Sequence, residues 1–162
     1  MSTRQPSSST PPIRGDFEQV GDGAWTGWWK WSGKDPFEDG TGPFFVKKDE
    51  RGIVTGFRPE TKNLNGHGIV HGGSLMTFAD FSLFMVAASN GDEVSGVTVT
   101  MNCEFVSGAQ AGDLLTARGE CVRAGGSLVF ARGTILRVGA DGKEEAVLSF
   151  SGTIKRAKRT SH

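Results

Sequence analysis

Asp80 is the residue of this sequence whose surroundings most clearly suggest chemistry. It lies in an apolar run from Leu75 to Ala88 that also contains Thr77 and Ser82. An unpaired carboxylate in such surroundings is strongly disfavoured or takes up a proton, so its presence needs a reason. Asp80 is either a core residue satisfied by hydrogen bonds to a neighbouring strand, or a base or nucleophile in a cleft. The run by itself leaves both interpretations open.

A glycine-rich segment, residues 65–73, precedes that run and ends in Gly72 and Gly73, where a helix is expected to start. The first N–H groups of a helix have no acceptor within the helix and lie at the positive end of its dipole, so they can hold an oxyanion. Glycine also lets a substrate carbonyl approach the backbone closely. A tight strand-to-helix corner is the competing explanation of the same glycines.

His67 and His71 together with Asp80 raise the question of a zinc site. The glycines between the histidines deny the pair the i, i+4 geometry of a helix, and no cysteine pair or acidic cluster supplies further ligands. We therefore expect no metal. A serine nucleophile is equally unsupported, because the sequence contains no GxSxG turn.

The flanking pattern predicts the elements that position Asp80. A helix is expected from about Gly73 to Ser89, and because it is apolar on nearly every face it must be enclosed by protein. Residues 97–105 alternate clearly between apolar and polar side chains, which indicates a strand. Further strands are expected at 114–123, 127–138 and 145–155, and the four together predict an antiparallel meander. The expected fold class is α+β, with the sheet wrapped around one long buried helix.

The first half of the chain is less clearly patterned. Residues 44–48 and 53–57 predict a hairpin, Asp35 to Glu38 has the pattern of a helix start, and the four tryptophans of residues 25–31 fit a strand or an amphipathic turn. Residues 1–15 predict a disordered tail, although their composition faintly resembles a transit peptide. We expect a single domain over residues 16–157 and a basic tail over 158–162.

The amino-acid composition limits the classes of molecule that the chain is expected to bind. Eighteen basic residues balance eighteen acidic ones, which removes the electrostatic reason to expect a nucleic acid or a membrane as partner. A chain of 162 residues has the usual size of one domain, so we expect one site, and a small molecule or another copy of the chain as partner. Two cysteines, Cys103 and Cys121, are too few for a disulfide framework and fit a reducing cytoplasm.

The segment from Asn65 to Gly73, followed by Asp80, resembles the motif of the PaaI-like hotdog thioesterases. That motif has an Asn, then HGG, then an Asp nine residues after the His, an interval that His71 and Asp80 keep. The resemblance covers roughly residues 36–156. It implies a hotdog fold and hydrolysis of aryl or short- to medium-chain acyl-CoA thioesters to free acid and CoA. It also implies that no cofactor is needed, because CoA is part of the substrate, and that the chain forms a homodimer, often doubled into a tetramer.

The resemblance also implies roles for individual residues. Asn65 and the Gly72 amide would polarise the thioester carbonyl. Asp80 would attack this carbonyl or activate water, and Thr98 would hold the water. His71 would support the loop more than transfer protons.

The CoA phosphates need cations, for which Arg123, Arg132 and the basic run 155–159 are candidates, although a solvated surface explains each of them equally well. Two other functions stay open. A hotdog hydratase or dehydratase would depend on His71 paired with an acid, and a non-catalytic acyl-CoA-binding domain would keep the pocket without turnover. Release of free thiol distinguishes a thioesterase from both.

The predicted helix also implies a site built from two protomers. Gly73, expected to contact the substrate, and Asp80 lie about 10 Å apart along a helix axis, which is too far for one carbonyl to touch both. A two-fold axis beside antiparallel helices would bring Asn65 and Gly72 of one protomer to Asp80 and Thr98 of the other.

Overall fold

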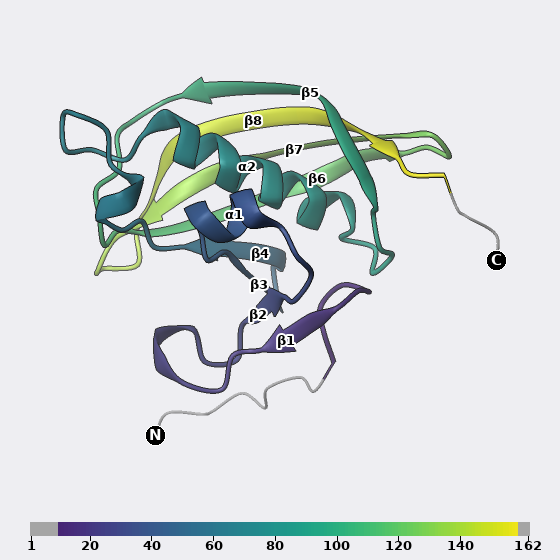
Figure 1. Ribbon diagram of the computed structural model, residues 1–162, viewed down its shortest axis with the longest axis horizontal. Helices are drawn as coiled ribbons and strands as arrows, with labels where there is room; N and C mark the ends of the chain where they lie inside the picture. Colours follow the sequence, from purple (N-terminus) through teal and green to yellow (C-terminus); the bar gives the residue numbers. More distant parts are fainter. Residues whose placement is uncertain (1–9, 159–162) are drawn as a thin grey trace.

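The structure, a computed structural model, describes residues 10–158 (Figure 1). An eight-stranded antiparallel sheet curves around the long helix α2 (Gly72–Ala87), and the short helix α1 (Pro36–Thr41) lies beside it. The strands have the order β1-β2-β3-β4-β6-β7-β8-β5. Their bounds are Phe17–Gln19 (β1), Trp29–Trp31 (β2), Phe45–Asp49 (β3), Gly52–Phe57 (β4), Gly96–Phe105 (β5), Leu114–Ala124 (β6), Leu128–Val138 (β7) and Glu144–Arg156 (β8). This arrangement is the hotdog fold, so the predicted α+β class and the enclosed helix are confirmed.

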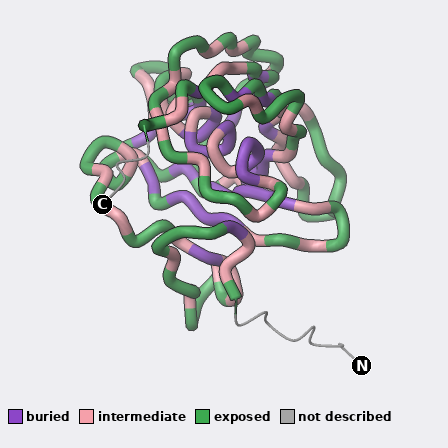
Figure 2. The backbone as a smooth tube through the Cα atoms, turned by 90° about the vertical axis from the view of Figure 1, so that its right-hand side faces the viewer, coloured by how far each residue is buried: buried purple, intermediate pink, exposed green. Residues whose placement is uncertain are grey.

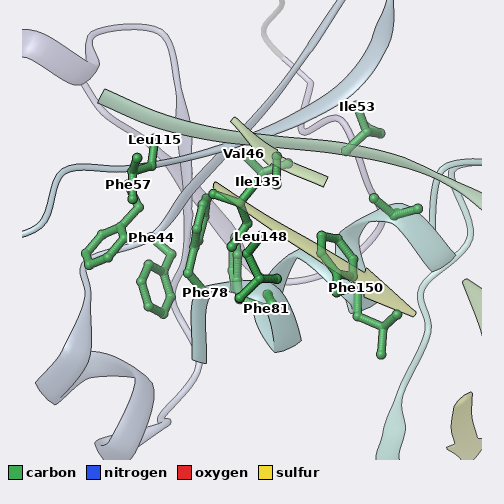
Figure 3. Close-up of a cluster of buried hydrophobic side chains, with 14 of the residues drawn as sticks. Phe44, Val46, Ile53, Phe57, Phe78, Phe81, Leu115, Ile135, Leu148 and Phe150 are labelled. Carbon is green, nitrogen blue, oxygen red and sulfur yellow. The ribbon is translucent and has the colours of Figure 1, made fainter. Parts of the chain in front are cut away.

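Helix α2 is enclosed because its apolar side chains point in nearly every direction. Figure 3 shows Phe78 and Phe81 of this helix beside Phe44, whose ring centroid lies 5.3 and 5.4 Å from theirs. Buried residues gather in the interior of the molecule (Figure 2). The buried hydroxyls of Thr55 and Ser82 lie 2.7 Å apart and satisfy each other. No helix in the described part of the chain is long and apolar enough to cross a membrane.

The strands of the second half form near the predicted positions, but they are not one meander of four. β6, β7 and β8 are consecutive neighbours, whereas β5 pairs with β8, with Cys103 opposite Phe150. The other neighbour of β6 is β4. The predicted meander is therefore wrong for β5, which is an edge strand. Alternation of apolar and polar residues reports which face of a strand is buried, and it carries no information about which strand lies alongside.

The tryptophan-rich segment contains both forms that the sequence left open, a single helical turn at Gly23–Trp25 and strand β2. Trp25 stacks on Phe45 with ring centroids 4.4 Å apart. A Cβ on Gly56 would lie 2.4 Å from the Trp25 ring, so only glycine permits this contact. The segment therefore covers β3 and β4.

The N-terminal segment packs on the domain earlier than the predicted boundary at residue 16. Ile13 is 3% exposed within the core cluster, and the Arg14 N–H donates to the Gly91 carbonyl oxygen at 3.3 Å. The apolar side chain of Ile13 is therefore buried, and the segment that carries it lies beside the loop that follows α2. Residues 1–9 and 159–162 of the two predicted tails lie outside the described residues. The division of the chain into tails and domain stays a prediction.

Candidate active site

Asp80 faces the start of β5 from the middle of α2. The Thr98 hydroxyl donates a hydrogen bond to Asp80 Oδ1 at 2.6 Å. Burial raises the pKa of Asp80 above its ordinary value; the hydrogen bond from Thr98 opposes this effect, and the charge of Asp35 adds to it. Asp80 is thus a half-buried carboxylate with raised basicity, held by one hydroxyl.

The start of α2 offers one unoccupied backbone donor. His71 caps the helix, and its Nδ1 accepts a hydrogen bond from the Gly73 N–H at 2.8 Å. The N–H groups of Ser74 and Leu75 donate to the His71 carbonyl oxygen at 2.9 and 3.2 Å. Among residues 10–158 no acceptor is found for the Gly72 N–H. Gly72 therefore keeps a free donor at the positive end of the helix, whereas the Gly73 N–H is occupied.

Asn65 is oriented by its own loop. Its Oδ1 accepts hydrogen bonds from the N–H groups of His67, at 2.9 Å, and Ile69, at 3.4 Å. Because donors occupy this oxygen, the side-chain NH₂ is the group left to donate to a ligand.

Asn63 is a supporting residue that the sequence analysis did not single out. Its side chain is buried, its Nδ2 donates to the Thr41 carbonyl oxygen at 2.8 Å, and its own carbonyl oxygen accepts from the His71 N–H at 2.7 Å. Asn63 thereby ties the glycine-rich loop to the end of α1. The signal for this role is the burial of the Asn63 side chain, which the sequence does not show, because an Asn in a loop is ordinarily exposed.

A cavity of about 430 Å³ opens beside Asp80 and Thr98. Asp35 and Glu38, at the start of α1, also line it. Burial and the negative charges of Asp35, Asp80 and Asp39 raise the pKa of Glu38 to about 7. The residues around Glu38 predict only a helix start, because nothing in them shows that α1 packs beside Asp80.

The predicted site residues form two groups within one chain. Asp80 and Thr98 line the cavity, but Asn65, His71 and Gly72 do not. Gly72 and Asp80 are eight residues apart in one continuous helix, or about 12 Å along its axis. The start of α2 lies instead at the end of β5, because a Cβ on Gly72 would lie 3.1 Å from the Phe105 ring.

The two arginines predicted to hold CoA phosphates lie away from this cavity. Arg132 is paired opposite Glu120, to which its Nε donates at 2.6 Å, and Arg123 is opposite Phe130. Val129 and Ala131 of β7 are buried on the face of the sheet that packs on the core. Because successive side chains of a strand point to opposite faces, Arg132, and Arg123 opposite Phe130, lie on the face away from the core. Arg14 is the basic residue that lines the cavity in the described part of the chain.

No group of three or more His, Cys, Asp and Glu side chains within residues 10–158 is arranged to hold a metal ion. The absence of a metal from the reaction stays a prediction.

Comparisons with known proteins agree with this architecture. The family model of the thioesterase superfamily matches residues 67–141, a range that includes Gly72, Asp80 and Thr98. No curated protein matches the chain by sequence.

Several solved structures are similar to this chain. A hypothetical thioesterase with coenzyme A from Streptococcus pneumoniae is 26% identical, with a TM-score of 0.59 over 73% of this chain and 91% of that one. The Escherichia coli PaaI protein of the phenylacetic acid degradation operon is 25% identical, with a TM-score of 0.63 over 77% and 86%. The TT0310 protein of Thermus thermophilus is 25% identical, with a TM-score of 0.61 over 77% and 100%. By these matches and by its architecture the chain is similar to the PaaI-like hotdog thioesterases, and just under half of it matches the model of the thioesterase superfamily.

Proposed function

We propose that this chain hydrolyses acyl-CoA thioesters to a free acid and CoA, with Asp80 as the nucleophile or general base. The observation that carries the proposal is the half-buried Asp80 carboxylate, held by Thr98 at 2.6 Å beside a cavity. The Streptococcus pneumoniae relative contains coenzyme A, which supports a CoA thioester as the substrate. The reaction needs no cofactor, because CoA leaves as a product. We place the protein in the cytoplasm, where free cysteines persist.

The site offers two routes to the same products. As a base, Asp80 takes a proton from a water whose other hydrogen bonds to the Thr98 oxygen, and the water oxygen adds to the thioester carbonyl carbon. As a nucleophile, Asp80 adds to that carbon itself and forms an anhydride that water then hydrolyses. In both routes the C–S bond breaks and CoA leaves as a thiolate that takes up a proton. The Gly72 N–H and the Asn65 NH₂ would donate to the developing oxyanion.

We further propose that each site is shared by two protomers. β5 runs antiparallel to α2, so Thr98 near its start lies beside Asp80, and Phe105 at its end lies beside Gly72. A two-fold axis at the middle of this edge strand would bring the Gly72 end of one protomer to the Asp80 end of its partner. Apolar side chains exposed along β5 and just after it supply surface for such a contact: Val97, Val99, Phe105 and Val106. A further doubling into a tetramer stays a prediction.

A thiol-release assay with a panel of aryl- and alkyl-CoA thioesters tests the proposed function. We expect stoichiometric formation of free CoA and acid. Binding of acyl-CoA without thiol release would instead support a non-catalytic domain. Water addition to enoyl-CoA without thiol release would support a hydratase.

Thr98→Val is expected to lower turnover roughly 10- to 100-fold, which corresponds to the free energy lost with one hydrogen bond to a charged group. Valine keeps the shape of threonine but has no hydroxyl to hold Asp80 or water. Thr98→Ser restores the hydroxyl and should stay within a few-fold of wild type. Steady-state rates of thiol release compare the three proteins. A fully active Thr98→Val enzyme would remove this residue from the mechanism.

A further inference from the structure

The cavity beside Asp80 has one apolar wall and one acidic wall. Aromatic and aliphatic side chains of α2 and of the N-terminal segment form the apolar wall: Phe81, Phe84, Met85, Ile13, Phe17 and Trp31. Asp35 and Glu38 form the acidic wall together with Asp80. Because Asp80 acts on the thioester carbonyl in the proposed reaction, one of the two groups attached to that carbonyl would enter this space, and the apolar wall favours the acyl group over the polar CoA.

Glu38 is the acidic residue of this wall whose carboxylate has no partner within residues 10–158. Its backbone N–H donates to Asp35 Oδ1 at 3.0 Å, but neither a hydrogen bond nor an ion pair of its side chain is found there. The carboxylate is half-buried and lies close enough to Asp80 to feel its charge. A further negative charge near Asp80 is thus built into the cavity, and no cation within residues 10–158 is paired with it.

The other charged groups around Glu38 are mostly acidic as well. Asp35 and Asp39 belong to α1 and its cap, Asp80 to α2, and Glu93 to the loop before β5. The N-terminal segment supplies the only basic residue among the described residues lining the cavity, the exposed Arg14.

We propose that this cavity receives the acyl group and that Glu38 makes it select uncharged acyl groups over those that end in a carboxylate. The proposal rests on the proposed function, which places the thioester carbonyl at Asp80. An alkyl or aryl tail gains the burial of its apolar surface against the apolar wall. A terminal carboxylate would instead be brought into partly dehydrated space beside like charges, where repulsion is strong. Selection is therefore achieved by repelling the wrong substrate.

This selection changes with pH. Since burial and neighbouring charges raise the pKa of Glu38 to about 7, the residue is largely neutral at pH 6 and largely ionised at pH 8. The terminal carboxylate of a dicarboxylic monothioester has an ordinary pKa of about 4 and stays charged throughout. The preference for the uncharged substrate must therefore rise with pH. The requirement for an ionised Asp80 in catalysis applies to both substrates and therefore cancels from this preference.

The test compares kcat/KM for hexanoyl-CoA and adipoyl-CoA, which have the same chain length, at pH 6 and pH 8. Another pair of matched length replaces them if the thiol-release panel favours it. In wild type we expect the ratio of the uncharged to the charged substrate to increase on the order of tenfold between the two pH values. In Glu38→Gln we expect this ratio to stay nearly constant between the two pH values. Asp92→Asn is the matched control, because it removes one exposed charge that neither lines the cavity nor contributes to the raised pKa of Glu38, and it should keep the wild-type pH dependence.

If the enzyme releases thiol normally but the kcat/KM ratio of the two substrates changes neither with pH nor in Glu38→Gln, the proposed selectivity is wrong. The proposed function is unaffected by that result. A preference for adipoyl-CoA at pH 8 would also overturn the selectivity, by making Arg14 a counter-ion for the tail. If Glu38→Gln fails to fold, the wild-type pH dependence decides alone. Absence of thiol release across the whole panel would overturn the proposed function itself.

Discussion

Asp80→Asn is expected to lose at least about 10²-fold in turnover, because its amide can neither attack a carbonyl nor accept a proton from water. Asparagine keeps the size of aspartate and can still accept the hydrogen bond from Thr98. The variant should also stay folded. The pKa of Asp80 is raised in the folded chain, so folding favours its protonated form. Any stability that this group contributes is present at low pH and is lost as pH rises through the folded pKa. At neutral pH, removing the charge should therefore not destabilise the fold.

Rates of thiol release at saturating substrate and thermal unfolding curves check both expectations. Asp92→Asn is the matched control, since it removes an exposed charge just after α2 and does not line the cavity. The raised pKa also predicts that wild-type turnover falls with decreasing pH at a midpoint above the ordinary aspartate value of 3.8. A variant that retains more than about a tenth of wild-type turnover would reject Asp80 as nucleophile or base.

An equimolar mixture of Asn65→Ala and Asp80→Asn, unfolded and refolded together, is expected to recover about one quarter of wild-type activity. Asn65→Ala alone should lose about 10²- to 10³-fold in turnover, the usual effect of removing one oxyanion donor. With shared sites, random pairing makes half of the dimers mixed, and each mixed dimer contains one site with both residues intact. The distance of about 12 Å between Gly72 and Asp80 along one helix is the physical reason to expect sharing.

Each variant refolded alone measures the background, and refolded wild type measures the recovery. A mixture that stays inactive while wild type recovers would show that the site lies within one chain. The donor role of Asn65 has its own check, Asn65→Asp. This variant keeps the oxygen that accepts from His67 and Ile69 but has no NH₂. If it were active, or if Asn65→Ala changed only KM, Asn65 would not be an oxyanion donor.

The elements that position Asp80 are readable in the sequence because they depend on local pattern. The apolar run and the glycines before it predict α2 to within a few residues, and alternation predicts β5 almost to its bounds. The Asp35-Pro36 cap predicts α1, and the Asp35 carboxylate does accept from the Glu38 N–H. The spacing of Asn65, Gly72 and Asp80 also selects the candidate site residues, because this spacing belongs to the motif of one family.

Tertiary structure decided which of these pieces lie side by side. β5 pairs with β8 and is left as an edge, Ile13 reaches the core, and Arg132 pairs with Glu120 on the far face of the sheet. Glu38 lies in the same cavity as Asp80 although 42 residues separate them in the chain. Periodicity shows which face of an element is apolar, but the neighbour that covers this face is selected by packing between distant segments. Charge in the cavity, and with it the proposed choice of acyl group, depends on that packing.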